Sequence, residues 1–162
     1  MKSGALNFEI DGRVVLLGIG NESKWDDAAG VKVVKEVAKM IDSERVLSVN
    51  AGTIPEKFTS KVKDFEPDHI LLIDTVDIGE EPGTVSVVDP EAIVNQKIST
   101  HRLPLSMLME YLEKETGGEV FLIGIQPGEV KMGVGMSNSV QEAVEDLTEF
   151  LSEKLKRNIE NC

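Results

Sequence analysis

Cysteine is almost absent from this chain. One residue of this type occurs among 162, and it is the last, Cys162. A single thiol cannot form an intramolecular disulfide, and it cannot build a metal site from several thiolates. A metal ion held by this protein therefore needs oxygen or imidazole ligands. The scarcity of cysteine is also typical of a reducing compartment, and we expect the protein to be cytoplasmic.

Long apolar runs and an excess of positive charge are also missing. No stretch approaches the roughly 20 consecutive apolar residues that cross a bilayer, and the start, MKSGALNFEIDGR, lacks the apolar segment of a signal peptide. The formal net charge is −12, from 29 acidic and 17 basic side chains. Nucleic acids and anionic membranes need a basic footprint on their partner. We therefore expect no nucleic-acid partner and no insertion into a membrane.

Short runs rich in Val, Ile and Leu alternate with longer amphipathic segments. The first, third and fifth runs are almost continuously apolar, which is typical of central strands covered on both faces. The fourth follows the turn GEEPG and alternates better, so it is a candidate for an antiparallel edge strand. The runs cover Arg13–Ile19, Arg45–Asn50, His69–Asp74, Thr84–Asp89 and Val120–Ile125.

Apolar residues recur at spacings of three and four in the segments between these runs, which predicts helices. Alternation of strands and helices indicates a three-layer α/β domain with a mostly parallel sheet. We expect one domain over residues 1–162, with residues 1–12 as a candidate for a loosely attached arm. The helix candidates are Asp26–Asp42, Pro55–Asp64, Pro104–Thr116 and Ser137–Arg157.

The segment GIGNESKWDDAAG (Gly18–Gly30) follows the first strand, and a phosphate loop is one interpretation of it. A dinucleotide-binding loop needs a third glycine where this chain has Ser23. A pyrophosphate at the following helix would also be repelled by the charges of Asp26 and Asp27. A nucleotide-binding oxidoreductase domain is therefore a less favoured alternative.

The second interpretation is a site for a cation. The carboxyl ends of parallel strands meet at one edge of a sheet, where α/β proteins bind ligands. The first strand leads to Asp26 and Asp27, the second ends in Asn50, and the third ends in Asp74. Oxygen ligands suit a hard or borderline divalent cation. Alternatively, Asp26 caps the helix that it begins, and Asp27 serves only the helix dipole.

The two histidines are separated by geometry. His69 opens the strand that Asp74 ends, and five residues at about 3.3 Å each leave them roughly 16 Å apart. They cannot share an ion, and we expect His69 on the surface. His101 lies in a loop, ISTHRLPLS, that can reach the carboxyl edge. With Asp27 and Asp74 it would make a set of two carboxylates and one imidazole, unless it is an ordinary loop residue.

Six motifs, in their order along the chain, carry a resemblance to a known family. They are GIGNESKWDDAAG, NAGTIPE, LLIDTVDIGEEPG, VVDPEAI, STHRLPLSML and IGIQPGEV. From roughly Arg13 to Leu151 the chain resembles the nickel–iron hydrogenase maturation endopeptidases. It looks closest to the branch that processes the large subunit of formate-hydrogenlyase-type, membrane-bound energy-conserving hydrogenases. The resemblance implies an α/β/α sandwich around a twisted five-stranded sheet. It also implies an endopeptidase that removes the C-terminal extension of the large-subunit precursor after nickel insertion.

The resemblance also implies the site and its partner. The metal-contacting and catalytic positions of the family fall on Asp27, Asp74 and His101, and Asp26 is a further candidate for activating water. Nickel comes with the precursor, so we expect no resident cofactor, although the site is expected to accept nickel, zinc or cadmium in vitro. The partner would be the nickel-loaded precursor, bound by a monomer. Where the family has an aspartate in a DGGT-like turn, this chain has Asn50, which cannot ionise. A non-catalytic, metal-dependent binding domain for the same precursor is therefore the alternative.

Overall fold

The sheet at the centre of the protein has the strand order β1-β5-β6-β4-β2-β3. The computed structural model describes residues 2–3, 6–93, 103–128 and 135–161. Neighbouring described strands run parallel, apart from the antiparallel pair β5 and β6. The strands are β1 (Lys2–Ser3), β2 (Val14–Ile19), β3 (Val46–Gly52), β4 (His69–Thr75), β5 (Thr84–Val87) and β6 (Glu119–Ile125).

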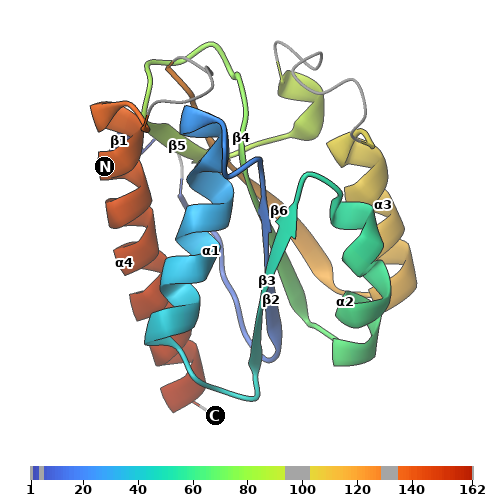
Figure 1. The fold of residues 1–162 in the computed structure, drawn as a ribbon. Coiled ribbons are helices and arrows are strands. Elements are labelled where there is room, and N and C mark those ends of the chain that lie inside the picture. Colours follow the sequence, from blue (N-terminus) through green and yellow to red (C-terminus); the bar gives the residue numbers. More distant parts are fainter. Residues whose placement is uncertain (1, 4–5, 94–102, 129–134, 162) are drawn as a thin grey trace.

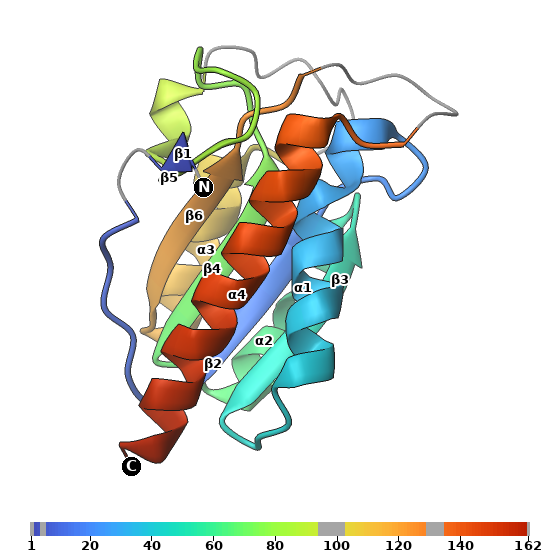
Figure 2. The same ribbon diagram turned by 90° about the vertical axis from the view of Figure 1, so that its left-hand side faces the viewer.

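Helices cover both faces of this sheet, as Figures 1 and 2 show. Helices α1 and α4 lie side by side on one face, and α2 and α3 pack together on the other. Along the chain, a short 3-10 helix precedes each of α1, α2 and α3. The helical elements are η1 (Trp25–Ala28), α1 (Ala29–Met40), η2 (Pro55–Phe58), α2 (Thr59–Phe65), η3 (Pro90–Ala92), α3 (Leu105–Thr116) and α4 (Asn138–Glu160).

The three apolar runs expected in the centre of the sheet form β2, β4 and β6, which are adjacent. All six residues of β2 and all seven of β4 are buried, because each strand has a helix layer on both sides. The predicted α/β/α sandwich is confirmed. The antiparallel fourth run is also confirmed as β5, but the two-residue β1 lies outside it, so β5 is not an edge strand.

Residues 6–12, just before β2, are held against the sheet, which corrects the expectation of a loose arm for this part of residues 1–12. Phe8 is 5% exposed and belongs to the core under α1 and α4. Its ring centroid lies 5.5 Å from that of Phe121 and 6.2 Å from that of Phe150. Burial of one such ring contributes roughly 2 kcal/mol, which is enough to fix the segment locally.

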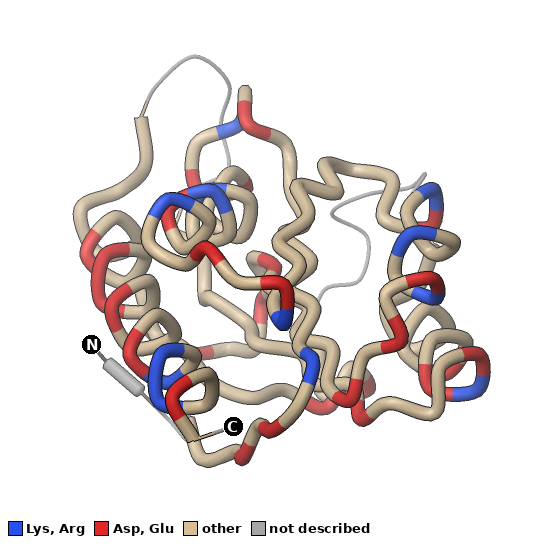
Figure 3. Tube along the Cα trace, turned by 90° about the horizontal axis from the view of Figure 1, so that it is seen from below, with Lys and Arg blue, Asp and Glu red and all other residues tan. Residues whose placement is uncertain are grey.

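Charged residues are distributed over the described helices (Figure 3). Acidic positions are spread over helices on both faces of the sheet, with basic positions between them (Figure 3). Within the described residues, no helix combines the length and the apolar character that crossing a bilayer demands.

Candidate functional site

The carboxyl edge of the sheet is shaped by two glycines. Gly20 has φ of +146°, and a Cβ at this position would collide with the backbone carbonyl oxygen of Asp27. A Cβ on Gly30 would collide with the carbonyl oxygens at the ends of β2 and β4, at Ile19 and Ile73. Glycine therefore lets η1 and α1 start directly above these two strands. Gly30 was not recognised from the sequence, although a glycine in the first turn of a helix can mark a close approach of backbone.

Asp27 lies in η1 and is 7% exposed. Its Oδ2 accepts a hydrogen bond of 3.0 Å from the backbone N–H of Asn21. Among the described residues, Oδ1 has no hydrogen-bond partner. One carboxylate oxygen is thus held by the glycine loop, while the other is available to a ligand.

Asp74 lies near the end of β4 and is 1% exposed. Its Oδ1 accepts a hydrogen bond of 2.8 Å from the backbone N–H of Thr75. The Thr75 hydroxyl donates a 2.7 Å hydrogen bond to the backbone carbonyl of Asp26. Because this bond ties the end of β4 to η1, Asp27 and Asp74 lie at the same edge of the sheet. Thr75 was not recognised from the sequence.

His101, the third predicted ligand, lies outside the described residues. Within the described residues, no three His, Cys, Asp or Glu side chains approach closely enough to hold a metal ion. His101 is not among these residues. The set of Asp27, Asp74 and His101 therefore stays a prediction.

Asp26 holds the segment that joins β6 to α4. It is fully buried, and its Oδ1 and Oδ2 accept hydrogen bonds of 2.8 Å from the backbone N–H groups of Ser137 and Gly128. The Ser137 hydroxyl lies 3.1 and 3.0 Å from the same two oxygens. The alternative of a helix cap is wrong, because the N-cap residue of η1 is Lys24 and no side chain makes a cap bond there. With both oxygens occupied, Asp26 is placed to position its neighbour rather than to activate water.

Asn50 is exposed at the end of β3. Its Oδ1 accepts a 3.2 Å hydrogen bond from the backbone N–H of Gly52, and its Nδ2 donates to Glu22 over 3.4 Å. A side-chain amide that bonds the backbone two residues on shapes a turn. Asn50 therefore orders the turn after β3, and it supplies no ionisable group.

His69 is buried, with 8% exposure, and the expectation of a surface residue is wrong. Its Nδ1 lies 3.1 Å from the backbone carbonyl oxygen of Asp11, and its ring is stacked on Phe121. The N-terminal segment that follows Phe8 covers this edge of the sheet, which the sequence pattern did not reveal. His69 and Asp74 do lie at opposite ends of β4, as their spacing predicted.

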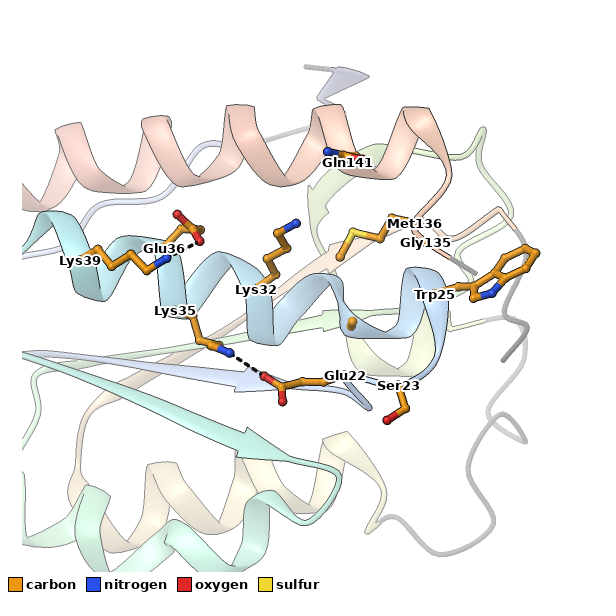
Figure 4. A pocket seen from close by; sticks show the side chains of 11 residues that line it. Glu22, Ser23, Trp25, Lys32, Lys35, Glu36, Lys39, Gly135, Met136 and Gln141 are labelled. Atoms are coloured by element: carbon orange, nitrogen blue, oxygen red, sulfur yellow. Dashed lines mark hydrogen bonds and ion pairs between the residues drawn. The ribbon is translucent and has the colours of Figure 1, made fainter. Parts of the chain in front are cut away.

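Two hollows lie near the glycine loop. One of about 630 Å³ sits between α1, α4 and the loop (Figure 4). Its Lys35 and Lys39 are paired with Glu22 and Glu36, each at 3.0 Å, and neither Asp27 nor Asp74 lines it. The other is an open groove of about 430 Å³ at the ends of β2 and β3, lined by Gly20, Asn21, Glu22, Ser23, Asn50, Ala51, Gly52, Thr53 and Phe58. Since Asn21 holds Asp27, this smaller groove is the one that adjoins the predicted site.

Known proteins share both the sequence and this architecture. The family model described as "Hydrogenase maturation protease" matches residues 31–154, which is more than half of the chain. The chain belongs to the hydrogenase maturation protease family. It is 33% identical over 138 residues to the Hydrogenase 3 maturation protease of Escherichia coli K12, covering 85% of this chain and 87% of that protein.

Solved structures of hydrogenase maturation proteases have the same fold. The crystal structure of HycI from Thermococcus kodakarensis KOD1 is 35% identical, with a TM-score of 0.82 over 90% of this chain and 93% of that one. The solution structure of the endopeptidase HycI from Escherichia coli is 30% identical, with a TM-score of 0.76 over 87% and 90%. This maturation protease is therefore an enzyme of the peptidase class, and these comparisons give the nucleotide-binding alternative no support.

Proposed function

We propose that this protease removes the C-terminal extension of a nickel–iron hydrogenase large-subunit precursor after nickel insertion. The precursor would belong to a formate-hydrogenlyase-type enzyme, for which the identity of 33% to a Hydrogenase 3 maturation protease is the support. The reaction would take place in the cytoplasm, with the protease acting as a monomer. Nickel is part of the substrate in this proposal, and the protease needs no cofactor of its own.

One observation carries the proposal: two carboxylates from separate elements lie at one edge of the sheet. The bond from Thr75 to the backbone of Asp26 joins those elements, and Asp27 keeps one oxygen without a described partner. With the imidazole of His101, these groups would grip the nickel of the precursor. A site of carboxylate and imidazole, with no thiolate, binds such an ion moderately and leaves positions for ligands from the substrate.

The grip would place the scissile peptide beside the groove at the ends of β2 and β3. A divalent ion polarises a carbonyl group and lowers the pKa of a bound water. The contribution of this chain is to hold the carboxylates in place before the substrate arrives. The N–H of Asn21 orients Asp27, and the N–H of Thr75 orients Asp74. Neither side chain then has to be ordered on binding, which favours a productive geometry.

A cleavage assay tests the proposal. The purified protease is incubated with nickel-loaded and with nickel-free precursor, and loss of the C-terminal extension is followed by mass spectrometry. We expect cleavage of the nickel-loaded form alone, and little cleavage by Asp74→Asn or His101→Ala. Asp42→Asn is the matched control, because Asp42 is an exposed aspartate just past the far end of α1. Normal cleavage by both site variants would refute the assignment of these residues.

The alternative of a non-catalytic binding domain rests on the neutral Asn50 alone, and membership of a protease family disfavours it. The same assay separates the two, since a binding domain would capture the nickel-loaded precursor without changing its mass. If Asn50 only shapes its turn, Asn50→Asp should leave the cleavage rate unchanged, because Asp makes the same turn. Cleavage that appears only in Asn50→Asp would instead show that the natural chain has lost an essential acid.

A further inference from the structure

We propose that β3 is a docking strand for the precursor, which adds an extended segment next to its scissile bond to the open edge of the sheet. This inference rests on the proposed function, and it names the surface by which that substrate is held. The occupant is an extended peptide recognised mainly through its backbone. Such strand addition is a common way for a sheet to bind a peptide.

The first support is the position of β3 in the sheet. It is the last strand in the order and, among the described strands, it pairs with β2 alone. In Figure 1 it lies in front, with no described element between it and the viewer. Proteins usually protect such edges with charged residues, proline or a very short strand. The seven residues of β3, VLSVNAG, contain none of these charges and no proline.

The second support is the direction of the backbone groups. The carbonyl of Arg45 accepts a 2.9 Å hydrogen bond from the N–H of Val14, so it points toward β2. Backbone groups of successive residues in a strand point to opposite sides. Leu47 and Val49 therefore also face β2, while Ser48 and Asn50 turn their N–H and C=O groups to the open edge. These groups can pair with an added strand.

The third support is that this edge leads into the groove beside the predicted site. Asn50 and Gly52, at the end of β3, line this groove together with Gly20 and Asn21, which follow β2. The N–H of Asn21 holds Asp27, so a peptide that passes Asn50 arrives next to that carboxylate. Beside the groove, Ile54 is 39% exposed and offers an apolar contact. An extended chain fits this groove, because most residues that line it are glycine, alanine or small polar residues.

A pair of variants at one position tests the docking strand. Ser48→Pro removes the N–H that faces the open edge and leaves the bonds to β2, whereas Ser48→Ala keeps the N–H. Binding of the nickel-loaded precursor is measured by isothermal titration, independently of cleavage. We expect Ser48→Pro to raise the Kd by up to about ten-fold, as the loss of one hydrogen bond predicts. Ser48→Ala should bind like the natural chain.

Hydrogen exchange gives a second measurement that needs no variant. The amides of Ser48 and Asn50 should exchange about ten-fold more slowly, or slower still, when the nickel-loaded precursor is present. Binding of the precursor without this protection would overturn the inference, as would unchanged affinity in a folded Ser48→Pro. Protection that depends only on the protease concentration would overturn the inference, because it would show that β3 pairs with a second copy of the protein. If the proposed function fails but the docking strand is correct, the precursor will bind and protect these amides without losing mass.

Discussion

The two edges of the sheet carry similar side chains and use them in opposite ways. At the amino edge, His69 is buried against Phe121, with its Nδ1 beside Asp11 and its Nε2 3.7 Å from a carboxylate oxygen of Glu119. At the carboxyl edge, Asp27 is buried to a similar degree, yet one of its oxygens has no described partner. An imidazole or carboxylate whose hydrogen bonds are satisfied stabilises the fold, whereas one with an open atom can hold a ligand.

The largest expected effect is on catalysis at the carboxyl edge. Asp74→Asn removes one of the two charges that we propose to hold the nickel of the precursor, while Asn keeps the size of the side chain. We expect the rate of tail removal to fall about 100-fold or more, on the scale of lost electrostatic groups in active sites. Mass spectrometry of the nickel-loaded precursor over time measures it. A rate within a few-fold of the natural chain would place the chemistry elsewhere.

The second prediction contrasts neighbouring aspartates. Asp26→Asn should lower the free energy of unfolding by about 3 kcal/mol, because its fully buried carboxylate accepts bonds from two backbone N–H groups and a hydroxyl. Asp27→Asn disturbs a single such bond and should lower it by about 1 kcal/mol. Urea unfolding measures both. For cleavage we expect the reverse order, with the larger loss of rate in Asp27→Asn. If the two variants lose equal stability and equal cleavage rate, the proposed difference between the two aspartates is wrong.

The third prediction concerns the amino edge. His69→Ala removes a stacked ring and its polar contacts, and should lower the free energy of unfolding by about 2 kcal/mol. Because His69 lies at the other end of β4 from Asp74, cleavage at 25 °C should stay within about two-fold, as expected for distant, independent sites. Urea unfolding and the cleavage assay check the two parts. A large loss of cleavage in a protein that stays folded would show that the edges are coupled.

The smallest effect is expected in the larger hollow between α1 and α4. Lys32 points into this hollow (Figure 4), and the described residues give it no ion pair. Lys32→Ala should change the cleavage rate by less than about two-fold, because neither predicted carboxylate lines the hollow. Lys35→Ala, which breaks an exposed pair with Glu22, is the matched comparison. A clear loss in Lys32→Ala alone would make the hollow part of the substrate site.

Much of the fold was predictable, since periodicity and apolar runs report burial directly. The stripe Val140, Val144, Leu147, Leu151 and Leu155 is buried along α4, as its spacing predicted. What the sequence could not show depends on contacts between distant segments. The burial of His69 requires the N-terminal segment, and the role of Asp26 requires Gly128 and Ser137, more than 100 residues away. Alternation of strands and helices put Asp27 and Asp74 at one edge, because parallel strands share their direction.

The bonds of Asp26 have a consequence for a chain still on the ribosome. Its partner Ser137 immediately precedes α4, so the backbone beside Asp27 cannot be secured until synthesis has passed Ser137. Nascent chains would then carry the sequence of a protease before the segment around Asp27 is fixed. The protease would therefore become active late, once α4 has packed against the sheet.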